Sequence, residues 1–181
     1  MKRRHQLWWE TSVTSAGNVT SLIYGALGYK FDEKNKELLH TPFAQFLKVT
    51  SEIRTLLKIS GRQYLAARLM GGVLWSYGNQ TVSPYSEQFY IGGANSLRAF
   101  TVRSLGPGTY NPGKDVKYGY LDQTGDIKLE ANVEYRFPIL GDLHGATFLD
   151  AGNVWLIRKD ASRPGGQLTL KNFAKSIALN T

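Results

Sequence analysis

The chain has 181 residues, of which 42% are hydrophobic and 12% aromatic, and it contains no cysteine. Its length suits one domain, and its four Trp, ten Tyr and eight Phe residues exclude a disordered chain. No run approaches the ~18 apolar residues that a membrane-spanning helix needs, which excludes a helical membrane protein. Without cysteine, neither a disulfide framework nor a thiolate metal site can form.

The net charge of +8 raises the question of a nucleic-acid partner. Basic residues cluster only within residues 1–5, and elsewhere they occur singly, often two residues from another charge. A nucleic-acid module gathers Lys and Arg on one face beside stacking aromatic residues. We therefore expect no nucleic acid among the partners.

Taken in chain order, the predicted elements are strands with period-two alternation at residues 6–15, 43–58, 63–77, 126–138, 143–155 and 176–181. The alternation is clearest in residues 126–138. One face of that segment holds Ile127, Leu129, Ala131, Val133, Tyr135 and Phe137, and the other holds Lys128, Glu130, Asn132, Glu134 and Arg136. The longest segments exceed the ~5–6 residues usual in soluble strands and match the ~9–11 that cross a bilayer at a tilt.

The connections between these segments alternate in length. Residues 59–62 and 140–142 are tight turns with a glycine, whereas 16–41, 78–125 and 156–171 are long. Short turns at one end and long loops at the other are typical of a bacterial transmembrane β-barrel. The predicted fold class is therefore all-β: an antiparallel transmembrane β-barrel of about six strands.

Six strands are fewer than the ~8 of the smallest membrane barrels, and an open sheet would leave unsatisfied edges in hydrocarbon. We expect residues 1–181 to form a partial barrel domain, with the remaining strands outside them. Aromatic residues near the strand ends are expected either at the membrane interfaces or in an ordinary core. These residues are Trp8, Trp9, Trp75, Tyr77, Tyr135 and Trp155.

The connection 78–125 is long enough to indicate a functional loop. It contains Gly92 and Gly93, which permit a tight reversal, and then Leu97, Arg98, Ala99 and Phe100. An arginine beside an aromatic residue suits a segment that fills a cavity, because the ring packs while the guanidinium seeks a carboxylate.

This loop resembles that of the BamA/TamA family of outer-membrane insertases, which folds into the barrel and carries a [VI]-R-G-[FY] motif after a Gly-Gly pair. Leu97 is a mild departure from that motif. Ala99 replaces its glycine, which preserves the motif if the backbone there has a negative φ. Residues 125–138 and 146–155 resemble the strands that follow the loop, so the resemblance covers nearly the whole chain.

The resemblance implies that Arg98 contacts inward carboxylates of these two strands, which here are Glu134 and Asp150. Alternation places both on the polar faces of their strands, and one guanidinium can bind two carboxylates. The alternative is that the three are separate, water-exposed charges of the barrel interior.

The resemblance further implies a function in the bacterial outer membrane, where such proteins insert unfolded β-barrel clients with periplasmic or lipoprotein partners and contact lipid. It also implies periplasmic POTRA repeats outside this chain. His5, His40 and His144 share no ligand spacing, and no nucleotide-binding or hydrolase motif occurs, so we expect no enzyme, metal or cofactor. Two other hypotheses remain: a secretion channel or porin, and a soluble β-sheet binding module with its apolar rows buried.

Overall fold

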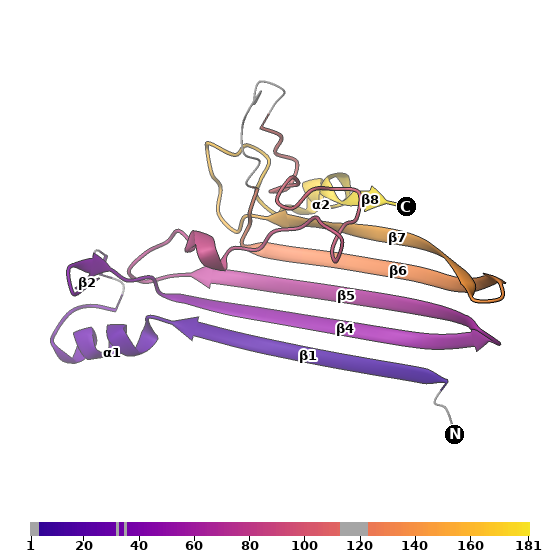
Figure 1. Ribbon diagram of the computed structural model, residues 1–181. Coiled ribbons are helices and arrows are strands. Elements are labelled where there is room, and N and C mark those ends of the chain that lie inside the picture. The colour runs from indigo at the N-terminus through magenta and orange to yellow at the C-terminus, as the bar shows by residue number, and fades with distance from the viewer. Residues whose placement is uncertain (1–3, 32, 35, 113–122) are drawn as a thin grey trace.

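The computed structural model describes residues 4–31, 33–34, 36–112 and 123–181 of the chain. Its main element is a six-stranded antiparallel sheet in the order β1-β4-β5-β6-β7-β8 (Figure 1). These strands are β1 (His5–Ala16), β4 (Phe46–Ser60), β5 (Gln63–Ser76), β6 (Ile127–Leu140), β7 (Leu143–Trp155) and β8 (Ala178–Asn180). Each of the six matches a predicted segment, and the sheet is open, as expected of a partial barrel.

The register places polar and apolar residues in separate rows across neighbouring strands. One row runs through Trp8, Arg54, Arg68, Asn132 and Asp150, and the adjacent row through Trp9, Ile53, Leu69, Ala131 and Ala151. We call the side with the first row the inner face and the side with the second row the outer face. The alternation read from the sequence is therefore the alternation between these two faces.

The buried core lies on the inner face, beneath the long loop. It consists of Phe46, Leu74, Phe89, Ile91, Leu97 and Val154. On the outer face, Leu69 and Leu149 remain 50% and 47% exposed, so no layer of the described residues covers them. A soluble module would have to bury these outer rows, and the structure leaves them open.

Two of the long connections contain elements that the sequence did not predict. The first holds α1 (Asn18–Ala26) and a small hairpin of β2 (Glu37–Leu38) and β3 (Thr41–Pro42), and the third holds α2 (Leu170–Ser176). The loop between β5 and β6 holds only a short 3-10 helix, η1 (Tyr85–Glu87), in its described part. Because α2 extends to Ser176, the last strand is shorter than the predicted 176–181. Within the described ranges, no helix is long and apolar enough to cross a membrane.

The aromatic residues near the strand ends divide between two environments. Trp75 is on the outer face near the end of β5 and more than half exposed, as expected for a membrane interface. Trp9 is also outward and more than half exposed, but it lies in the row of Ile53 and Leu69, away from the ends of those strands. Trp155 is 1% exposed, stacks on Phe173 of α2 and donates to Ser176, so of the two expected environments it has the ordinary core. Trp8 lies in the inner-face row, where the Arg54 guanidinium packs on its ring, so it is not an outward girdle residue either.

Candidate functional site

The loop between β5 and β6 lies across the inner face of the sheet, over β5, β6 and β7 (Figure 1). It is closed at its base where Phe89 and Gly125 exchange two backbone hydrogen bonds of 2.8 Å. Residues 113–122 of the predicted loop 78–125 lie outside the described residues. The part that carries the motif is described in full.

The paired glycines reverse the chain before the motif. Gly92 has a φ of 103° and Gly93 a φ of 93°, a region that favours glycine. A Cβ on Gly92 would lie 2.1 Å from the Thr101 carbonyl oxygen, so no side chain fits there. The reversal is closed by backbone hydrogen bonds from Gly93 to Phe100 and from Arg103 to Ile91. Glycine at position 92 is therefore required on both steric and conformational grounds.

The reversal directs Arg98 at the inner face, where it contacts both predicted carboxylates. Its Nε and Nη2 donate to the two oxygens of Asp150 at 3.0 and 3.1 Å, and its Nη1 donates to Glu134 at 2.6 Å. The Arg98 backbone N–H also donates to Asp150, at 3.2 Å. One guanidinium thus joins the loop to β6 and β7 together, instead of remaining a separate interior charge.

The surroundings of Arg98 favour its charged form. Its guanidinium lies 3.7 Å from the centre of the Phe148 ring, and the Asp150 side chain is fully buried. Hydrogen bonding to Asp150, with a further contribution from Glu134, raises the pKa of Arg98 above its ordinary value. The contact is therefore an ion pair, in which the planar fork of arginine matches a carboxylate.

The remaining motif residues fix the same segment by packing. Leu97 is fully buried and lies over Gly152 of β7, where a Cβ would approach its Cδ1 to 3.2 Å. Phe100 packs against the core from the side of the loop. Ala99 is exposed and is not among the residues with a positive φ. Alanine therefore fits this position without strain.

Residues 38–178 match the model of the Omp85 superfamily domain, which is most of the chain. The chain belongs to the Omp85 superfamily. It is also 34% identical over 90 residues to the outer membrane protein assembly factor BamA of Neisseria meningitidis serogroup B, a match that covers 46% of this chain and 11% of that relative. The matched stretch thus covers about a tenth of that protein's length. Together with the open antiparallel sheet, these matches identify a bacterial outer-membrane protein of the BamA/TamA type, described over part of its barrel.

The loop between β5 and β6 has a second polar anchor that the sequence did not indicate. Glu130, fully buried on β6, accepts from Ser96 at 2.7 Å and from Arg68 at 2.6 Å. Arg68 also donates to the Asn95 carbonyl at 2.9 Å, and Asn132 donates to that of Ser96 at 2.9 Å. The alternation of the sequence places Glu130, Asn132 and Arg68 on the polar face of their strands. Only the path of the loop in the structure shows that these three residues bind the loop.

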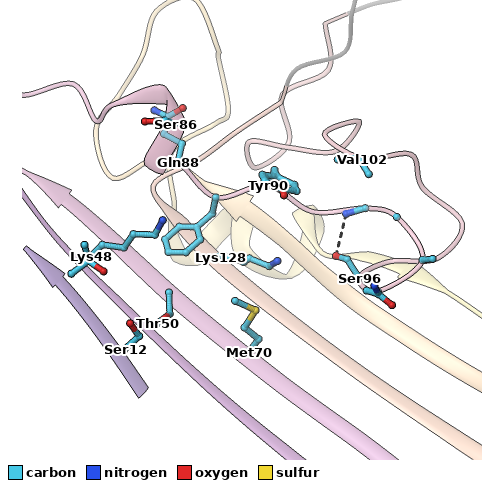
Figure 2. Close-up of a pocket in the computed structure, with 16 residues that line it drawn as sticks. Ser12, Lys48, Thr50, Met70, Ser86, Gln88, Tyr90, Ser96, Val102 and Lys128 are labelled. Carbon is cyan, nitrogen blue, oxygen red and sulfur yellow. Dashed lines mark hydrogen bonds between the residues drawn. The ribbon is translucent and has the colours of Figure 1, made fainter. Parts of the chain in front are cut away.

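The loop also has an apolar anchor beside a glycine of β5. A Cβ on Gly72 would lie 2.5 Å from Cζ of Phe89, so the Phe89 ring fills the space that a side chain would need. The Lys48 ammonium lies 5.0 Å from the centre of that ring. Lys48 and Lys128 border a cavity of about 700 Å³ between the loop and the inner face (Figure 2). Each of these lysines pairs with a carboxylate, Lys48 with Glu87 and Lys128 with Glu130.

The site is thus a brace that fixes the loop to the inner face of the sheet. Its polar anchors are the contacts of Arg98 and of Glu130, and its aromatic anchor is Phe89. Gly92 donates its N–H to the Ser96 hydroxyl at 3.1 Å, which links the reversal to the Glu130 anchor (Figure 2). Across the described part of the chain, no group of three or more His, Cys, Asp or Glu residues could hold a metal ion.

Proposed function

We propose that this chain is part of an insertase barrel that folds and inserts other β-barrel proteins into the bacterial outer membrane. The observation that carries the proposal is the clamp of Arg98 on Glu134 and Asp150, because it fixes a loop inside the barrel in the way that the family resemblance implies. The similarity to an outer membrane protein assembly factor supports the same assignment.

In the proposed mechanism, the brace keeps the strands β5, β6 and β7 in one rigid arrangement while another part of the barrel opens to a client strand. The three anchors bind the loop to strands that are adjacent in the sheet, so distortion of any one strand would strain the loop. The partners would be unfolded β-barrel clients, periplasmic or lipoprotein assembly factors, and outer-membrane lipid. The activity would involve no covalent step and no cofactor.

The test compares Arg98→Ala with Arg62→Ala in the intact protein, reconstituted in lipid vesicles. Arg62 is a matched control, because among the described residues it donates to Gly141 and Asp142 alone, at an exposed turn. We expect Arg98→Ala to destabilise the barrel by about 3 kcal/mol, because it leaves a buried carboxylate without its cation, and to lose most client insertion. Arg62→Ala should change neither. Wild-type insertion and stability in Arg98→Ala would contradict the proposal.

Ion conductance separates the insertase from a transport pore. A loop that is braced across the interior should hold conductance low in the wild type, and Arg98→Ala should raise it by releasing the loop. A steady conductance that is insensitive to Arg98 would instead favour a porin or secretion channel. Arg98→Lys sharpens the measurement, because lysine keeps the charge but cannot bind two carboxylates through a fork.

A further inference from the structure

The helix α1 has an apolar stripe that no described residue covers. Val19, Leu22, Ile23 and Ala26 recur at the spacing of one helix face, and Val19 and Leu22 are each 75% exposed. The helix contains no charged residue. An uncovered stripe of this kind on a helix without charges needs an apolar environment.

The opposite side of α1 is bound to the protein by polar contacts. Ser21, about 200° around the axis from Val19, is buried and accepts from the Lys36 ammonium at 3.4 Å. Lys36 is itself buried and also donates to the Lys30 and Phe31 carbonyls at 3.0 and 2.9 Å. The stripe therefore faces away from the surface to which the helix is attached.

Lys36 belongs to the same connection as α1 and is fixed in turn to Asn79, just beyond β5, whose side-chain oxygen accepts from the Lys36 backbone N–H at 2.6 Å. Tyr77 follows Trp75 in the outer-face alternation, and its hydroxyl donates to Asn18 at 2.9 Å. Gln45 likewise precedes Leu47, and a Cβ on Gly17 would lie 2.9 Å from its Cγ. The start of α1 thus lies beyond the ends of β4 and β5, next to residues that extend their outer-face rows (Figure 1).

The level of α1 along the barrel is that of a membrane interface. Trp75 pairs with Leu47, and Leu47 with Ser15, three residues before the helix begins. Trp75 is exposed on the outer face, and tryptophan is enriched where membrane meets water. Below this level lie the exposed apolar rows of the outer face, so the stripe continues a surface that already faces lipid.

We propose that α1 lies in the plane of the outer leaflet, with its stripe at the boundary between lipid headgroups and acyl chains. Helices with one apolar side bind at this depth by burying that side. The long connections of such barrels are extracellular, which assigns the leaflet. The inference goes beyond the proposed assembly function, and it depends only on the outer-membrane location of the barrel.

The test measures the depth of spin labels in the intact protein, reconstituted in phospholipid vesicles. This chain contributes no cysteine, so Ile23→Cys and Val19→Cys place single labels on the stripe. Gly25→Cys is the matched control, because it is exposed, about 160° around the axis from Ile23 and about 120° from Val19, and a Cβ there meets nothing within 4 Å. Power saturation with oxygen and with a water-soluble nickel chelate reports whether each label contacts lipid or water.

We expect labels at positions 19 and 23 to have an oxygen-to-nickel accessibility ratio severalfold higher than the label at position 25. Equal ratios at all three positions, with full access to nickel, would overturn the proposal, because the stripe would then face water. Labels at 19 and 23 that are shielded from both reagents would overturn it in favour of a protein partner. Dipolar broadening between labels would overturn it in favour of a second copy of the chain.

Discussion

The inner and outer faces of the sheet are built from the same strands, yet they stabilise the protein in opposite ways. On the inner face of β7, Asp150 is fully buried and is held by four hydrogen bonds, from Arg98 and Asn132. On the outer face of the same strand, the adjacent Leu149 is exposed. The inner face therefore depends on specific partners, and the outer face only on being apolar.

This difference has a consequence for substitutions. A change on the inner face should matter according to which partner it leaves unpaired or displaces. A change on the outer face should matter according to polarity and depth in the bilayer. The predictions below test the two halves of this contrast, from the largest expected effect to the smallest.

The largest effect is expected for Asp150→Ala on the inner face. This substitution removes the acceptor of three Arg98 hydrogen bonds and leaves the arginine with Glu134 alone in a partly buried position. We expect a loss of about 3–5 kcal/mol in the free energy of unfolding, measured by urea denaturation in lipid vesicles. Asp142→Ala is the control, because its carboxylate is fully exposed and its ion pair with Arg62 should contribute little. Similar losses for the two variants would refute the brace.

The next effect is expected for Leu149→Arg on the outer face. Leu149 lies in the middle of β7, where arginine should cost about 2–4 kcal/mol in a bilayer. Leu143→Arg at the strand end should cost only about 0–1 kcal/mol, because its guanidinium can reach the interface. The same unfolding measurement checks both variants. Losses that do not depend on depth would show that the outer face does not contact the middle of a membrane.

A smaller effect separates the two faces at neighbouring glycines. On the inner face, a Cβ on Gly72 would overlap the Phe89 ring, so Gly72→Ala should cost about 1–3 kcal/mol through displacement of that ring. On the outer face, a Cβ on Gly71 meets only the Lys128 carbonyl oxygen at 3.9 Å, so Gly71→Ala should be neutral or stabilise by about 0.5 kcal/mol. Adding Phe89→Leu to Gly72→Ala should recover part of the loss. If both single variants behave alike, Phe89 is not an anchor.

The strands could be predicted from the sequence because alternation over ten or more residues is a local property. Alternation also placed Glu134 and Asp150 on the inner face, and the resemblance supplied Arg98 as their partner. The helices α1 and α2 were missed because their stripes are short and lie in connections that were expected to be irregular. The space at Gly72 could not be predicted, since it is defined by the ring of Phe89 in the loop, which only the folded chain brings near.

The smallest effect concerns Asp160, in the connection between β7 and α2, and it tests a charge that belongs to neither face. Hydrogen bonds from Ser162, with a further one from Arg163, lower the pKa of Asp160 from 3.8 to about 2. Because the folded pKa is depressed, this carboxylate stabilises its loop fully above about pH 4, and the contribution is lost as the pH falls toward 2. Ser162→Ala should move the pKa back toward 3.8, as measured by the carboxyl carbon shift in an NMR titration. The global unfolding free energy at neutral pH should hardly change, because the Asp160 side chain is 32% exposed and solvent screens its charge. A fall in that free energy as large as the one expected for Asp150→Ala would mean that connections far from the brace also hold the barrel together.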